Sequence, residues 1–217
     1  SVIGIAREIS ALLQTKLRIP PENKIINLNA FKTDKLCQET INSECIYTIS
    51  YIDNVNGKQT SPKWIKERLE KSDIKSKNLI VDITNYILLE QGQPLHAFDL
   101  DKLSQLIGRE VLPEDFGVRK AKNGEFLIAL DGIKYELNEN ISIVVCSDKP
   151  VAIAGVIGGL ETAVTEQTSS IILEGAVFNP SIIRKSSREI GIRTESSSRF
   201  EKGISFRNTL NSLSRAF

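Results

Sequence analysis

Apolar residues near the start of the chain recur with helical spacing. Residues 1–13 therefore predict an amphipathic helix, which the prolines at positions 20 and 21 keep from running further. No capping residue is expected at its start, so the segment looks like a connector that enters from a preceding domain. The apolar positions on one face are Val2, Ile5, Ile9, Leu12 and Leu13.

A second helix is predicted after residue 60. Ser61 suits its N-cap and Pro62 its first helical position. Trp64, Ile65 and Leu69 follow at helical spacing and are expected to face a core.

The stretch from 78 to 98 changes character along its length. Its first part, NLIVDIT, is rich in β-branched residues and suits a strand, whereas the second part resembles a helix that stops at Gly92. Pro94 favours extended backbone at Gln93, so residues 95–98 predict a short strand.

Strand patterns dominate most of the remaining chain. Residues 45–53 suit a strand, and Asp131–Gly132 between two alternating runs predicts a hairpin. Buried strands are expected in ISIVVC, KPVAIAGVIGG and SIILEGAVFNP, and helices with loops in SIIRKSSREIGI and SSSRFEKGI. The sum predicts an α+β fold, with a mixed, largely antiparallel sheet packed with helices in a single large domain.

Composition excludes some classes of protein. The 217 residues suffice for a core, and 41% apolar with 25% charged residues is ordinary for a globular chain. No apolar run suits a membrane span and no secretion signal is visible. Cys37, Cys45 and Cys146 lack CxxC spacing and His96 is the single histidine, so reduced thiols and no metal site are expected.

Charge is distributed unevenly along the chain. The net charge of +1 gives no overall attraction to nucleic acid, but residues 179–207 are rich in basic side chains, against Glu189, Glu195 and Glu201. A phosphate-binding surface and an ordinary solvated helix face both fit this pattern. The basic residues are Arg184, Lys185, Arg188, Arg193, Arg199, Lys202 and Arg207.

Several polar residues in apolar surroundings are candidates for chemistry. Thr84, Asn85 and His96 need partners there or serve a ligand, and on these residues alone His96 suits a core as well as a site. Glu174 lies within an apolar strand, where it either faces solvent or accepts a hydrogen bond from a ligand hydroxyl. The glycines of AIAGVIGG lack the order of a nucleotide-binding loop but suit the floor of a pocket.

A covalent nucleophile is not indicated. The sequence has no nucleophile elbow and no Cys–His pair at suggestive spacing. A hydrolase built on these residues is therefore expected to position a water molecule rather than to form a covalent intermediate.

Four long motifs occur in one order along the chain: VDITNYILLEQGQPLHAFD, AIAGVIGG, LEGAVFNP and RTESSSRFEKG. Together they closely resemble the central domain of the β chain of bacterial-type phenylalanyl-tRNA synthetases. The resemblance implies a connector helix at 1–19, an editing domain at 20–203 and the start of a linker at 204–217. The activity that it implies is hydrolysis of tyrosine wrongly esterified to the phenylalanine tRNA.

The resemblance also implies site residues. Thr84, Asn85 and His96 would lie near the scissile ester and its water, and Glu174 would meet the tyrosine hydroxyl. Ser196 stands where the family commonly has Ala, which would narrow the pocket or relax its choice between Tyr and Phe. The implied substrate-binding set is Glu174, Gly155, Gly158, Ala176, Thr194 and Ser196.

No class II synthetase motif for amino-acid activation is visible, so this segment is not expected to charge tRNA. The resemblance implies ATP and Mg²⁺ for the parent enzyme and no cofactor here. It implies tRNA(Phe) and an α subunit in an (αβ)₂ heterotetramer as partners, no membrane or DNA, and a location in the cytoplasm or a plastid stroma. An editing-inactive structural or RNA-positioning module and a free-standing trans-editing protein stay open as alternatives.

Overall fold

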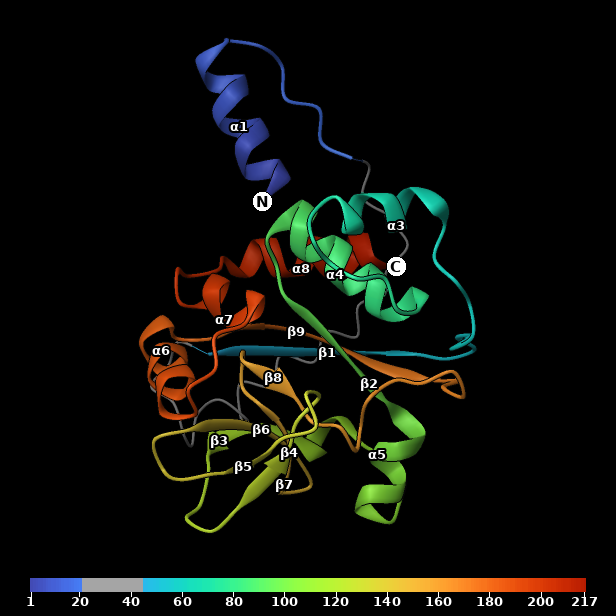
Figure 1. Cartoon of the computed structure of the whole chain (residues 1–217), viewed down its shortest axis with the longest axis vertical. Helices are drawn as coiled ribbons and strands as arrows, with labels where there is room; N and C mark the ends of the chain where they lie inside the picture. The colour runs from blue at the N-terminus through green and yellow to red at the C-terminus, as the bar shows by residue number, and fades with distance from the viewer. Residues whose placement is uncertain (21–44) are drawn as a thin grey trace.

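The computed structural model describes residues 1–20 and 45–217, which form the predicted α+β fold (Figure 1). The helices are α1 (Val2–Leu12), α3 (Lys63–Glu70), α4 (Leu79–Gln91), α5 (Leu100–Ile107), the 3-10 turn η1 (Pro113–Asp115), α6 (Pro180–Glu189), α7 (Glu195–Phe200) and α8 (Phe206–Ala216). The strands are β1 (Ile46–Ile52), β2 (Leu95–Asp99), β3 (Phe116–Lys120), β4 (Phe126–Ile128), β5 (Lys134–Glu136), β6 (Ser142–Cys146), β7 (Lys149–Ile153), β8 (Ile157–Gly158) and β9 (Ile171–Val177).

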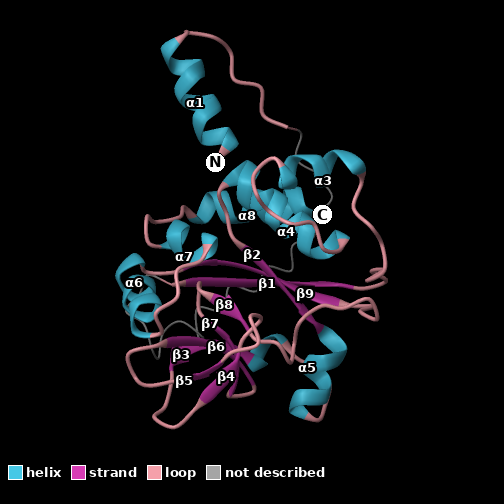
Figure 2. Cartoon of the chain, in the orientation of Figure 1, coloured by secondary structure: helices cyan, strands magenta, loops and turns pink. Residues whose placement is uncertain are grey.

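A three-stranded antiparallel sheet, β1-β9-β2, lies in the middle of the molecule, with α3, α4 and α8 on one side and the other strands on the opposite side (Figure 2). Its helix-facing residues include Ala97 and Leu173, which cluster with Ile80 of α4 and Leu213 of α8. The last strand in the sequence is the middle strand of the sheet, so β9 fixes the register of both neighbours.

The opposite face of this sheet packs on a second antiparallel sheet, β3-β6-β7-β8. Ile49, Phe98 and Ile172 from the first sheet join Ile143 and Val151 of the second in the main apolar core. The β4-β5 pair forms the hairpin predicted at Asp131–Gly132. The site is built in the space between these two sheets.

The prediction of a strand at the start of residues 78–92 is wrong, because residues 79–91 form one helix, α4. The Asn78 side chain accepts a hydrogen bond from the Val81 amide at 3.0 Å and caps the helix start. Buried Asp82 accepts hydrogen bonds from Ser61 and Ser76 and holds the first turn. These contacts outweigh the modest helix penalty of β-branched residues. The predicted stop at Gly92 is confirmed by its left-handed backbone, φ 78°.

The cap predicted for the second helix is displaced by one residue. Pro62 occupies the N-cap position and α3 begins at Lys63, while the Ser61 hydroxyl donates to Asp82 instead of capping. The burial predicted for Ile65 and Leu69 is confirmed. Trp64 stays 46% exposed and covers Tyr86 edge-on, so it contacts only the rim of this small core.

The predicted first helix is confirmed as α1, but its start is capped. The Ser1 hydroxyl oxygen accepts a hydrogen bond from the Gly4 amide at 3.1 Å, so the expectation of an uncapped helix is wrong. None of the described helices is long and apolar enough to cross a membrane.

Candidate functional site

His96 and Glu174 lie side by side on the face of the first sheet that meets the second sheet. They are direct partners in the β2–β9 register, and Ile49 of β1 is the partner of Glu174 on its other side. Side chains of directly paired residues project from the same face of a sheet. Glu174 is only 8% exposed, so the alternative that it faces solvent is wrong.

The Tyr47 hydroxyl donates a hydrogen bond to Oε2 of the Glu174 carboxyl group over 2.7 Å, and both groups are buried. Burial raises the pKa of Glu174 to about 7, against the opposing effect of this hydrogen bond. Burial also raises the pKa of Tyr47 well above its ordinary value, and the neighbouring Glu174 adds to that effect. Tyr47 therefore remains a donor, and near neutral pH Glu174 is divided between its two protonation states.

The His96 imidazole is held neutral. Burial lowers its pKa to about 4, and its ring packs edge-on against Phe98 with the ring centroids 4.4 Å apart. The Nε2 atom is inaccessible and has no hydrogen-bond partner among the described residues. A buried polar atom without a partner is a site where a ligand or a water molecule fits.

Two of the predicted glycines allow neighbouring side chains to pack directly against the backbone. A Cβ on Gly158 would lie 2.4 Å from His96 Cε1 and 2.7 Å from Nε2. The absence of a side chain at Gly158 therefore leaves room for the imidazole ring. Gly155 has a left-handed backbone with φ 66°, and a Cβ there would meet Phe178 and Phe200 at 3.0 Å. Gly159, the third glycine, is instead part of the sheet edge, where its amide donates to Val151.

Two cavities meet at this region. The inner cavity lies between the sheets, has a volume of about 60 Å³ and is lined in part by Gly155 and Glu174. The outer cleft has a volume of about 360 Å³ and reaches Thr84, Asn85 and Thr194. They share a wall that includes His96, Gly158 and Ser196. The outer cleft has the size of a small-molecule pocket, whereas the inner cavity holds only a few water molecules.

The structure thus gathers eight of the nine predicted site residues around the two cavities. The exception is Ala176, which is 1% exposed and lines neither, although its carbonyl accepts a hydrogen bond from Gln93 Nε2 at 3.0 Å. Lining a cavity does not test a catalytic role, so the roles of these residues stay predictions.

Two of the predicted residues also hold structure. The Thr194 hydroxyl caps α7 by accepting from the Ser197 amide at 3.0 Å and donates to the Val156 carbonyl at 2.8 Å. The Thr84 hydroxyl donates to the Val81 carbonyl of its own helix at 2.8 Å. Asn85 is therefore the more available polar group on the α4 wall of the cleft.

The sequence motifs missed Tyr47, Lys77 and Leu130, of which the last two line the outer cleft. The alternation of Tyr47, Ile49 and Tyr51 indicates a shared face of β1. It does not indicate that this face is the one that carries Glu174, because that depends on the register with β9.

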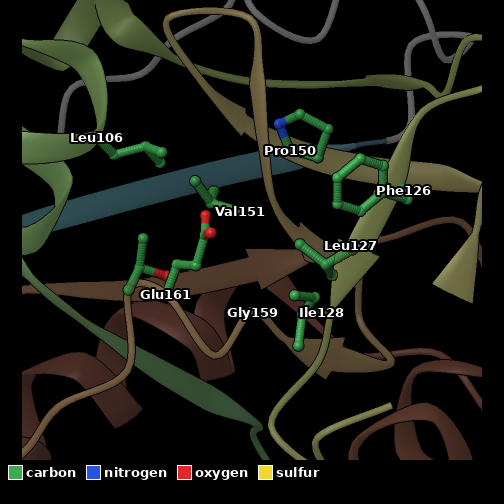
Figure 3. Close-up of a pocket in the computed structure, with 9 residues that line it drawn as sticks. Leu106, Phe126, Leu127, Ile128, Pro150, Val151, Gly159 and Glu161 are labelled. Atoms are coloured by element: carbon green, nitrogen blue, oxygen red, sulfur yellow. The ribbon is translucent and has the colours of Figure 1, made fainter. Parts of the chain in front are cut away.

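A third, smaller cavity lies beside β4 and β7 and has a volume of about 40 Å³ (Figure 3). None of the predicted site residues lines it, and Glu161 is the carboxylate on its wall. Within residues 1–20 and 45–217, no group of three or more His, Cys, Asp or Glu side chains is arranged to hold a metal ion.

A family model described as the B3/4 domain matches residues 44–217, and the chain belongs to this family. A phenylalanine–tRNA ligase β subunit of Prochlorococcus marinus (strain MIT 9312) is 69% identical over 216 residues, 100% of this chain and 26% of that protein. The β subunit from Synechococcus sp. (strain CC9605) is 45% identical with the same coverage. The predicted resemblance to the synthetase β chain is confirmed, and the chain spans 26% of the length of these relatives.

Among solved structures, an N-terminal fragment of the phenylalanyl-tRNA synthetase β subunit from Pyrococcus horikoshii aligns with a TM-score of 0.40 and 14% identity. The alignment covers 87% of this chain and 56% of that one. A likeness at this level carries no argument about the site.

Proposed function

We propose that this domain hydrolyses tyrosine esterified to tRNA(Phe) and so edits the product of a phenylalanine–tRNA ligase. The observation that carries the proposal is a buried carboxyl group, Glu174, directly beside the unpartnered His96 at the base of an open cleft. The names of the relatives and the motif resemblance supply the substrate class.

Glu174 suits the recognition of a phenol hydroxyl. A pocket that merely accommodates phenylalanine cannot strongly reject tyrosine, whereas a pocket that hydrogen-bonds the hydroxyl rejects the analogue that lacks it. Phenylalanine in this cleft would leave the buried Glu174 carboxyl without its ligand hydrogen bond. With the aromatic ring in the outer cleft, the hydroxyl would enter the inner cavity, which is too small for the ring.

The proposed reaction adds water to the ester carbonyl carbon. The carbon–oxygen bond to the ribose then breaks, the ribose hydroxyl takes a proton, and tyrosine leaves as its acid. A histidine with a pKa near 4 is a weak base but still accepts a hydrogen bond, so His96 orients the water molecule, with Asn85 on the α4 wall of the same cleft. The backbone amide groups of Gly155 and Gly158 are the candidates for stabilising the oxyanion.

The test is hydrolysis of Tyr-tRNA(Phe) and Phe-tRNA(Phe) by the full ligase and by variants of this domain. Tyr-tRNA(Phe) is expected to be hydrolysed faster than Phe-tRNA(Phe). Glu174→Ala should lower that selectivity by about 100-fold, because the hydroxyl loses its partner. Glu174→Gln keeps an acceptor oxygen and is expected to retain much of the selectivity. His96→Ala should lower the rate for both esters.

An editing-inactive module is the second candidate. The observation that favours it is that Tyr47 already bonds Glu174 and that the inner cavity is only about 60 Å³. Equal and uncatalysed loss of both esters with the unmodified ligase would support this candidate and contradict editing.

The remaining proposals concern the full-length enzyme to which this domain would belong. ATP and Mg²⁺ would serve amino-acid activation outside this segment, and an α subunit in an (αβ)₂ heterotetramer would complete the ligase. The proposed location is the cytoplasm, or the stroma where the gene is carried by a plastid. Co-purification of an α chain with the full-length β subunit tests the assembly.

A further inference from the structure

A wide groove of about 920 Å³ is lined by residues of α7, the start of α8 and α1. Figure 1 shows where these three helices lie in the fold. Its lining is strongly basic. The cationic side chains on it are Arg7, Arg193, Arg199, Lys202 and Arg207, and Glu195 is the one acid among the described lining residues. We call this surface the basic groove.

Most of this positive charge is not neutralised by the protein. Arg7, Arg193, Lys202 and Arg207 are exposed, and none of them forms an ion pair within the described part of the chain. The Glu195 carboxylate, by contrast, pairs with Arg199 at 2.6 Å. The single acid of the groove is therefore offset by its own neighbour, and four cations remain for a partner.

The basic groove is continuous with the outer cleft through the short segment 193–199. Thr194 and Ser196 line the cleft, whereas Arg193 and Arg199 line the groove. Glu195 lines both. A molecule whose end lies in the cleft therefore meets these cations as it leaves.

We propose that the basic groove binds the phosphates of the single-stranded 3′ end of an RNA whose terminal ribose carries the ester in the cleft. This rests on the proposed function, because the ester places the last ribose in the cleft and its phosphates beyond it. A run of phosphates matches a row of unpaired cations, whose binding releases counterions. An acidic protein segment matches the charge as well, but it gives no reason for continuity with an ester-sized cleft.

The test compares two triple variants of the full ligase with the same change in charge. The groove variant is Arg193→Gln, Lys202→Gln and Arg207→Gln. The control is Lys71→Gln, Lys75→Gln and Lys120→Gln, whose side chains are exposed and line neither cavity nor groove. Two esters are used: Tyr-tRNA(Phe), and 2′(3′)-O-tyrosyl adenosine, which presents the same ester without phosphates.

The groove variant is expected to lose about tenfold or more in kcat/KM for Tyr-tRNA(Phe), with a salt dependence shallower by about 2 in the log–log slope. Hydrolysis of tyrosyl adenosine should be unchanged, and the control variant should match the unmodified ligase on both esters.

Each other outcome overturns one proposal. Equal Tyr-tRNA hydrolysis by the groove and control variants would show that the groove does not hold the RNA, while editing stands. If the groove variant fails to hydrolyse either ester, the substitutions act through the cleft, and this result would contradict RNA binding by the groove. If the unmodified ligase hydrolyses neither ester, the editing proposal is wrong. The groove proposal is then tested by the salt dependence of binding to uncharged tRNA(Phe). Equal log–log slopes for the groove variant and the control variant would overturn it. Displacement by polyglutamate but not by RNA would assign the groove to a protein partner.

Discussion

Glu174 and His96 are neighbours on adjacent strands, and burial shifts their pKa values in opposite directions because it disfavours the charge of each. The motifs indicated both residues from the sequence. They did not indicate Tyr47, whose hydrogen bond to Glu174 joins residues 127 positions apart. Alternation in β1 predicts the face of Tyr47 relative to Ile49, but no local signal sets the register with β9. Residue types were therefore predictable, whereas this contact was not.

Tyr47→Phe should raise the pKa of Glu174 further above 7. The substitution keeps the ring and removes the donor that stabilises the carboxylate form, which leaves burial unopposed. The measurement is a ¹³C NMR titration of the labelled glutamate carboxyl carbon.

Tyr51→Phe is the matched control for that titration, because the Tyr51 hydroxyl donates to the Val111 carbonyl and not to Glu174. A Glu174 titration with the same midpoint in Tyr47→Phe and in the unmodified protein would show that this hydrogen bond does not tune the carboxyl group.

At the scale of elements, α4 shows how contacts distant in the chain decide a local structure. Its β-branched start predicted a strand, but Asp82 in its first turn accepts hydrogen bonds from Ser61, Ser76 and the Lys77 amide. Ser61 belongs to the segment before α3, so the residues of α4 alone do not indicate its hydrogen bond to Asp82. The hairpin at residues 126–136 was predictable, since its turn residues and both strands are local.

Asp82→Ala should lower the free energy of unfolding by about 3 kcal/mol, because three buried or part-buried donors lose their acceptor. Urea unfolding followed by circular dichroism measures this. Asp53→Ala, at an exposed position, is the control and is expected to stay within about 0.5 kcal/mol of the unmodified protein. Similar midpoints for the two variants would contradict a stabilising role for Asp82.

At the scale of the whole molecule, the polar pair lies in the seam between two sheets, and the fold favours the neutral form of both groups. His96 contributes stability that is present above its ordinary pKa of 6.5 and is lost as the pH falls towards 4. Glu174 contributes stability that is present below 4.5 and is lost as the pH rises towards 7. The two dependences oppose each other, so the unmodified protein should show a shallow stability profile between pH 4.5 and 6.5.

Glu174→Gln separates these dependences. The variant has no carboxyl group to ionise, so its stability relative to the unmodified protein should rise between pH 4.5 and 8 by about 3 kcal/mol, the free energy of a pKa shift from 4.5 to about 7. Chemical unfolding at intervals across this range tests it. A difference between the two proteins that does not change with pH would show that Glu174 titrates in the fold as it does when unfolded.

The closeness of Gly158 to His96 has a consequence for how such a domain can change over generations. The backbone of Gly158 is not left-handed, so alanine is conformationally permitted there, but its Cβ would collide with the His96 imidazole and would lie 3.2 Å from the Leu130 side chain. A glycine codon becomes an alanine codon through a single base change. One methyl group would therefore force the imidazole out of its place, and a single reverse substitution would restore that place.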